Sequence, residues 1–184
     1  MLAPTSFLCY TKRMKFDYQT LYASNLRFLE KRPFLKKWLP LINHVLTGSF
    51  FVAYAALLAY VFTADLSAAE RLKPVFIPLL CLLTVSVLRM AIDRPRPYAS
   101  NGAGIVPLVE KKNQDNKSFP SRHLACAAVI AMTCLPYFLW GGCLLFAFGI
   151  LLGFIRFSMG LHYPTDLLAG FTLGILCGCV FYLL

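Results

Sequence analysis

Hydrophobic residues in this chain gather in runs long enough to cross a lipid bilayer, and polar residues are confined to the segments between them. The first run extends from about Ile42 to Phe62 and the second from Pro74 to about Ile92. An apolar block covers residues 123–157, and a last run covers residues 164–184. Because about 20 apolar residues cross the hydrocarbon core of a bilayer, the pattern predicts an all-α, multi-pass membrane bundle.

The apolar block 123–157 is too long for one crossing. Gly141-Gly142 predicts a tight turn that splits it into two spans. The chain is therefore expected to hold five transmembrane helices. Residues 16–38 alternate leucines with charges, which favours a helix lying in the membrane interface and anchored by Trp38, although a plain basic leader has a similar composition. We thus expect a basic interfacial segment over 1–41 and a transmembrane catalytic domain over 42–184.

Composition supports a membrane protein and changes the choice of partner. Hydrophobic residues make up 59% of the chain, its mean hydropathy is +0.66 and its formal net charge is +10. The positive charge flanks the apolar runs, with +6 over residues 1–41 and +4 over residues 74–123. A nucleic-acid-binding protein would carry a basic stripe on a soluble fold. Anionic lipid headgroups are therefore the expected partner, and no nucleic acid is expected.

Residues capable of chemistry occur after residue 80, at the ends of the apolar runs. With five spans, the long polar segment 93–122 and the segment between the fourth and fifth spans lie on one face of the membrane. Cations, imidazoles, a hydroxyl and a carboxylate would then converge there, and a lipid phosphate is the partner that suits them. The candidates are Arg89, Arg96, Ser121, Arg122, His123, Arg156, His162 and Asp166.

The first group of candidates is the segment RMAIDRPRP, residues 89–97. An arginine in or near a span is costly and suggests function, and Arg89 lies near the end of the second span. Its alternative role is that of a snorkelling arginine that holds lipid headgroups. Pro95 and Pro97 end the helix, so Arg96 is expected just past it.

The second group is SFPSRH, residues 118–123, which runs directly into an apolar helix. Ser121 is well placed as the N-cap of that helix, whose free amides would form an anion site. His123, in the first turn, would reach the same anion. The alternative is an ordinary helix cap followed by an interfacial histidine.

The third group is RFSMGLHYPTD, residues 156–166. Arg156 ends one helix and His162 precedes the next. Asp166 follows His162 by four residues, a spacing that lets its carboxylate accept a hydrogen bond from Nδ1–H and leaves Nε2 free to attack. The alternative is a helix-capping aspartate beside a loop histidine.

Taken together, the three groups resemble the signature of the type 2 phosphatidic acid phosphatase (PAP2) superfamily. The family pattern is Lys-x6-Arg-Pro, then Pro-Ser-Gly-His, then Ser-Arg-x5-His-x3-Asp. Here the segments read Arg89-x6-Arg96-Pro97, then Pro120-Ser121-Arg122-His123, then Ile155-Arg156-x5-His162-x3-Asp166. Arg89 replaces a lysine, Arg122 a glycine and Ile155 a serine. The extra cation Arg122 could engage a second phosphate or a larger headgroup.

The resemblance implies a metal-independent lipid phosphatase without a cofactor, similar to the bacterial undecaprenyl-pyrophosphate phosphatases. His162 would attack phosphorus and form a phosphohistidine, Asp166 would fix its tautomer, and His123 would act as general acid and then base. Arg89, Arg96, Ser121, Arg122 and Arg156 would bind the phosphate. The substrate would be a polyprenyl diphosphate, phosphatidic acid or phosphatidylglycerol phosphate, and the pH profile would be bell-shaped.

Three other functions fit parts of the sequence. A phosphotransferase would pass the same phosphoryl group to a lipid or sugar. A silent lipid-binding protein is disfavoured by the presence of all three catalytic candidates, and a vanadate-dependent peroxidase is disfavoured by the spans. The positive-inside rule would place residues 1–41, and the site with them, in the cytoplasm. Because the site's arginines are not topology signals and the resemblance favours the outer side, we expect an extracytoplasmic site in the cell membrane.

Overall fold

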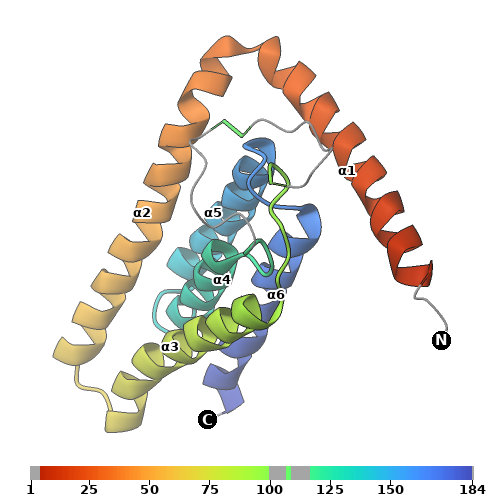
Figure 1. The fold of residues 1–184 in the computed structure, drawn as a ribbon. Coiled ribbons are helices and arrows are strands. Elements are labelled where there is room, and N and C mark those ends of the chain that lie inside the picture. The colour runs from red at the N-terminus through yellow and green to blue at the C-terminus, as the bar shows by residue number, and fades with distance from the viewer. Residues whose placement is uncertain (1–4, 100–106, 109–116, 184) are drawn as a thin grey trace.

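The computed structural model describes residues 5–99, 107–108 and 117–183, with side chains described from residue 18 onward. This part of the chain is helical apart from connecting segments and one isolated bridge between Arg94 and Lys117. Its helices are α1 (Thr5–Glu30), α2 (Pro33–Thr63), α3 (Ala68–Ala91), α4 (Arg122–Cys134), α5 (Leu139–Ser158) and α6 (Pro164–Leu183) (Figure 1). The predicted all-α class is confirmed.

Four of the described helices, α2, α3, α5 and α6, are long and apolar enough to cross a membrane. The prediction of five spans is not confirmed, because α4 has only 13 residues. At 1.5 Å per residue it is about 20 Å long, shorter than the hydrocarbon core of about 30 Å. It is apolar for another reason: it packs against α3, α5 and α6, and its residues from Leu124 to Cys134 are nearly all buried. Its side chains meet protein rather than lipid.

The turn between α4 and α5 lies at residues 135–138, not at Gly141-Gly142 as predicted. Pro136 has no N–H with which to continue the hydrogen-bond ladder of α4, so the helix ends there. Gly142 lies inside α5, where a Cβ atom would come within 2.6 Å of the Leu135 side chain. The glycine at position 142 therefore allows the turn to pack closely on α5.

The predicted interfacial helix over 16–38 is divided between two helices. Pro33 occupies the first turn of α2, where its fixed φ and missing N–H are tolerated, and α1 ends before it at Glu30. Residues 33–41 therefore extend the helix of the first span. After the short connection that follows α2, α3 begins with a capping box in which Ser67 and Glu70 satisfy each other's backbone N–H groups.

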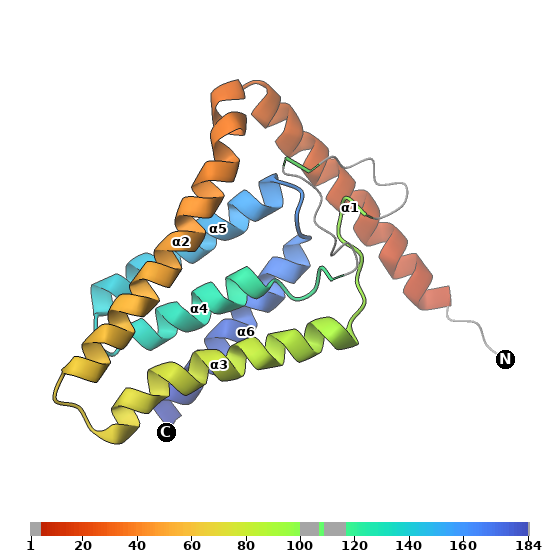
Figure 2. The ribbon, with the colours of Figure 1, turned by 60° about the vertical axis from the view of Figure 1, so that its left-hand side comes forward.

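Helix α1 lies across one end of the bundle. The C-terminal ends of α3 and α5 and the N-terminal ends of α4 and α6 all face it (Figures 1 and 2). Its attachment is polar as well as apolar: the Asn25 amide donates to the Ser158 carbonyl at 3.2 Å, and the Ser158 hydroxyl donates back to the Asn25 side chain at 3.1 Å. The bundle end that carries the site residues is thus the end that α1 covers.

Three glycines, Gly170, Gly174 and Gly178, form the face of α6 that packs on α4. A Cβ atom at Gly170 or Gly174 would overlap the carbonyl oxygens of Ser121 and Ala125. Small residues allow such close backbone contact between membrane helices. The glycine stripe therefore sets the distance between α6 and the start of α4.

We expect Gly170→Ala to lower the thermal stability of the purified protein and to reduce its activity, because the new methyl group must push the Ser121 backbone away. Overpacking of this kind typically costs about 1–3 kcal/mol. The matched control is Gly48→Ala in α2, where a Cβ atom would meet nothing within 4 Å. Equal melting temperatures for the two variants in detergent would show that α6 and α4 do not depend on this contact.

Candidate active site

The structure brings together candidates that are up to 77 positions apart in sequence. They come from the end of α3, the segment after it, the start of α4, the end of α5 and the start of α6. Six of the eight are almost completely buried, with exposed fractions of at most 7%: Arg89, Arg96, Ser121, Arg156, His162 and Asp166. The other two, Arg122 and His123, begin α4 and line a neighbouring groove.

His162 is 1% exposed, and its ring is oriented by a backbone carbonyl. Its Nδ1 atom lies 3.0 Å from the Ser118 carbonyl oxygen. Since a carbonyl oxygen can only accept, Nδ1 must carry the proton, and Nε2 of the neutral ring keeps its lone pair. The geometry thus leaves a nucleophilic nitrogen at Nε2.

The predicted hydrogen bond between His162 and Asp166 is replaced by a less direct contact. Nδ1 lies 3.7 Å from the nearer Asp166 oxygen, which is too long for a hydrogen bond. The Ser118 hydroxyl instead donates to this oxygen at 2.5 Å, and the Tyr163 backbone N–H donates to it at 3.1 Å. Asp166 acts on the imidazole through its charge, while the Ser118 carbonyl holds the ring.

Two residues of this network, Arg94 and Ser118, were not among the predicted candidates. Arg94 donates to the second Asp166 oxygen at 2.6 Å and to the Thr165 hydroxyl at 2.9 Å. The signal for Arg94 was the alternation Arg94-Pro95-Arg96-Pro97, which places two guanidinium groups along an extended backbone. Ser118 carries no comparable signal, because its carbonyl acts through backbone geometry and its hydroxyl meets Asp166, a residue 48 positions away.

Arg89 ties the end of α3 to the segment 117–120, which precedes α4. Its guanidinium group donates to the Pro120 carbonyl at 3.0 Å and to the Lys117 carbonyl. The Ser118 N–H donates to the Arg94 carbonyl at 2.9 Å, beside the bridge between residues 94 and 117. Since its two described partners are neutral carbonyl groups, the positive charge of Arg89 is not cancelled by these contacts.

Arg156 and Ser121 complete the buried group. Arg156 donates to the side-chain oxygen of Asn43 in α2 at 3.2 Å, and its Nε atom has no hydrogen-bond partner among the described residues. Ser121 is the N-cap of α4, as predicted, but its hydroxyl makes no cap bond and likewise has no described partner. These donors can therefore bind a ligand oxygen.

The site carries an excess of positive charge. Arg96 lies close enough to Arg89, Arg156 and His162 for its charge to act on all three. Asp166 is the one buried carboxylate in the described part of the chain, against three buried arginines. Because a low local polarity strengthens the interaction between charges, such a cluster favours binding of a multiply charged anion.

Burial also decides the charge state of His162. Removal from water is the main cause that lowers the pKa of His162 to about 4; the nearby guanidinium groups of Arg156 and Arg96 act in the same direction, and the Asp166 carboxylate opposes the shift. The imidazole is therefore neutral at physiological pH, as the lone pair on Nε2 requires.

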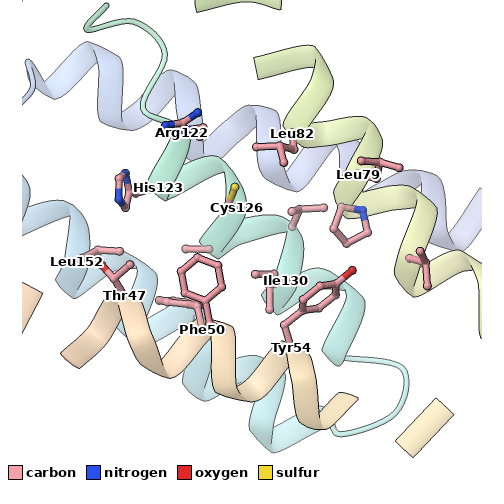
Figure 3. A pocket seen from close by; sticks show the side chains of 15 residues that line it. Thr47, Phe50, Tyr54, Leu79, Leu82, Arg122, His123, Cys126, Ile130 and Leu152 are labelled. Carbon is pink, nitrogen blue, oxygen red and sulfur yellow. The ribbon is translucent and has the colours of Figure 1, made fainter. Parts of the chain in front are cut away.

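An apolar groove of about 620 Å³ reaches Arg122 and His123, the two residues that directly follow Ser121 of the buried cluster (Figure 3). Aliphatic and aromatic side chains of α2, α3, α4 and α5 line it, among them Phe50, Leu82 and Leu152. Arg122 and His123 lie together on α4 at one end of the groove. The groove therefore joins an apolar interior to a cation and an imidazole.

Fold and site define a class: a multi-pass helical membrane protein with a buried cationic site at the end of an apolar groove. The sequence profile of the PAP2 superfamily matches residues 70–184, which include every candidate. The chain belongs to the PAP2 superfamily.

Individual relatives agree with this assignment. The chain is 30% identical over 97 residues to undecaprenyl-diphosphatase BcrC of Bacillus subtilis (strain 168), a match that covers 52% of this chain and 48% of that protein. The match thus spans about half the length of that relative. The fold is similar to Aquifex aeolicus LpxE, with a TM-score of 0.67 and 24% identity over 89% of this chain and 96% of that one.

A second solved structure has the same fold. It is the first transmembrane PAP2 type phosphatidylglycerolphosphate phosphatase from Bacillus subtilis, with a TM-score of 0.65 and 22% identity over 99% of this chain and 95% of that one. At these identities the two structures establish the shared fold.

Proposed function

We propose that this chain is an integral membrane phosphatase that releases phosphate from a lipid phosphate or diphosphate through a phosphohistidine. The observation that carries the proposal is the buried, neutral His162, with Nδ1–H held by the Ser118 carbonyl and three arginines around it. The names of two relatives suggest a polyprenyl diphosphate or phosphatidylglycerol phosphate, and the family resemblance adds phosphatidic acid. All of these join a phosphate to a long apolar tail.

In the first step, Nε2 of His162 attacks phosphorus in line with the bond to the leaving oxygen. The P–N bond forms and the P–O bond breaks, and His123 donates its proton to the departing oxygen. The imidazole gains positive charge as it reacts. The Asp166 carboxylate, 3.7 Å from Nδ1, stabilises that charge.

In the second step, the now neutral His123 takes a proton from water, and the hydroxide attacks the phosphohistidine. The P–N bond breaks, inorganic phosphate leaves, and His162 returns to its original tautomer. Arg89, Arg96 and Arg156 would bind the equatorial oxygens through both steps, together with the Ser121 hydroxyl. Fixed positive charge of this kind stabilises the transition state of phosphoryl transfer.

The groove gives the substrate its orientation. An acyl or prenyl tail between α2, α3 and α4 would place its headgroup at Arg122 and His123, next to the buried cluster. His123 would then face the leaving oxygen, as a general acid requires. In a diphosphate the leaving group is itself a phosphate, and Arg122 stands where that second charge would lie.

The test is phosphate release by detergent-purified protein against lipid mono- and diphosphates, with EDTA present. We expect metal-independent release, and we expect Arg122→Gly, which restores the family residue, to lower kcat/KM for the diphosphate by about tenfold with a smaller effect on monophosphates. Lys117→Ala serves as a control cation next to the site. Equal losses on both substrate classes would remove the role assigned to Arg122, and no release from any lipid would contradict the proposed function.

The pH profile follows from the burial of His162. Its pKa is lowered to about 4, so kcat/KM should stay high as the pH falls and decline only near about pH 4, where Nε2 becomes protonated and loses its lone pair. The alkaline limb would report deprotonation of the general acid His123 and should change in His123→Ala. An acid limb near about pH 6.5, the ordinary value for histidine, would contradict the assignment of the buried imidazole as nucleophile.

We further propose that the α1-covered end of the bundle faces the outside of the cell membrane. The support is the family resemblance, together with the functional use of the arginines, which removes them from the topology signal. Asp93 is exposed beside the site, and a cysteine placed there in a background without the native cysteines would react with a membrane-impermeant maleimide in intact cells. Reaction only after lysis would place the site in the cytoplasm.

A further inference from the structure

Helix α1 packs an aromatic residue against the segment that carries the candidate active-site histidine. Tyr18 is 4% exposed, and its ring lies edge-on to Tyr163 at 4.8 Å and to Phe157 at 5.9 Å between centroids. Tyr22, one turn further along α1, stacks on Tyr18 at 6.0 Å. Tyr163 directly follows His162, so α1 packs on the residue next to the proposed nucleophile.

The Tyr163 ring has a second partner, Arg94. Its guanidinium carbon lies 4.4 Å from the ring centroid, within the range of a cation–π contact. The same guanidinium group donates to Asp166 at 2.6 Å. A chain of contacts thus runs from Tyr18 to the Tyr163 ring, from that ring to Arg94, and from Arg94 to the Asp166 carboxylate.

The contact is made by the Tyr18 ring rather than by its hydroxyl group. The hydroxyl oxygen is buried and has no hydrogen-bond partner among the described residues. About two helical turns after Tyr18, the reciprocal hydrogen bonds between Asn25 and Ser158 fix α1 to the end of α5. Helix α1 is therefore attached to both ends of the segment 158–163, at Ser158 and at Tyr163.

We propose that Tyr18 and Arg94 are positioning residues: the Tyr18 ring of α1 and the Arg94 guanidinium both hold the Tyr163 ring and so fix the segment that carries His162 and Asp166. Neither residue is placed on the phosphate or on the reacting nitrogen. Helix α1, whose sequence predicts a helix in the membrane interface, would then also support the active site. The proposal rests on the function proposed above for His162.

The test compares Tyr18→Phe, Tyr18→Ala and Leu21→Ala, the last a control at a position of α1 that is 54% exposed. Tyr18→Phe keeps the ring, and its kcat should remain within about twofold of wild type. Tyr18→Ala should lower kcat by about tenfold, because small misplacements of a reacting group are costly. The inhibition constant of inorganic phosphate should not change, since the phosphate-binding arginines are untouched.

Arg94→Ala should produce a similar loss of kcat, and the double variant with Tyr18→Ala should lose little more, because both substitutions release the same segment. Hydrogen–deuterium exchange of a peptide covering residues 158–166 gives a readout that does not need activity. Exchange there should accelerate in Tyr18→Ala and stay at the wild-type rate in Tyr18→Phe and Leu21→Ala.

Three results would overturn the proposal: wild-type kcat and exchange in Tyr18→Ala, equal losses in Tyr18→Phe and Tyr18→Ala, or a loss of phosphate binding with faster exchange through the whole bundle. The last would make Tyr18 a general packing residue. A wild-type protein that releases no phosphate would sink the proposed function, and the exchange experiment would then decide the positioning claim independently.

Discussion

Replacing His162 by alanine is expected to reduce kcat for phosphate release on the order of 10⁴-fold or more, the scale seen when a covalent nucleophile is removed. The reason is geometric: the Ser118 carbonyl oxygen, 3.0 Å from Nδ1, fixes the proton there, and His162 is the one buried histidine among the described residues. The measurement is single-turnover phosphate release from a lipid diphosphate in detergent.

The matched control for this substitution is His44→Ala. His44 is exposed on α2, its ring contacts the Pro40 carbonyl of its own helix at 2.7 Å, and it has no part in either proposed step. Its activity should equal that of wild type. If His162→Ala kept kcat within about tenfold of wild type, with a melting temperature like that of the control, histidine attack on phosphorus would have to be abandoned.

Replacing Arg156 by alanine is expected to have the second largest effect, a loss of about 10³-fold in kcat/KM, which is typical of an arginine that stabilises phosphoryl transfer. Its Nε atom has no described hydrogen-bond partner, and its described acceptor is the neutral oxygen of Asn43, so its charge is available to the substrate. Arg156→Lys should restore activity in part, because lysine supplies the charge without the planar fork.

Arg71→Ala is the matched control for Arg156. Arg71 is a half-buried arginine near the start of α3, and its guanidinium group donates to the Ala64 carbonyl at 3.1 Å. We expect it to affect stability slightly and kcat/KM not at all. Equal losses of kcat/KM in Arg71→Ala and Arg156→Ala would mean that buried arginines matter to this protein for folding and not for phosphate binding.

The sequence pattern predicts the fold class and the convergence of the site because both depend on period and order. Apolar runs fix α2, α3, α5 and α6 as helices, and their connectivity brings Arg89, Ser121 and Arg156 to one end of the bundle. The number of spans could not be predicted the same way. The residues of α4 are apolar because protein surrounds them, and hydropathy alone does not distinguish that surrounding from lipid.

The details of the site depended on contacts that sequence spacing does not encode. The four-residue spacing of His162 and Asp166 suggests a direct hydrogen bond, but Asp166 is engaged by Arg94, Ser118 and the Tyr163 amide and stays 3.7 Å away. The acceptor for Nδ1 is a backbone carbonyl, which any residue could supply. The contact between Tyr18 and Tyr163 joins positions 145 apart and likewise leaves no local pattern.

The most direct test of the account is to trap the covalent intermediate. His123→Ala lacks both the acid of the first step and the base of the second, but the leaving group of a diphosphate is a phosphate, which departs with less need of an acid. Mixing this variant with a lipid diphosphate and quenching in alkali should therefore accumulate phosphohistidine, which mass spectrometry of the digested protein would locate. We expect phosphorylation of His162 in this variant and none in the His162→Ala protein. Phosphate release without a phosphorylated histidine, or phosphorylation at another residue, would contradict the proposed mechanism.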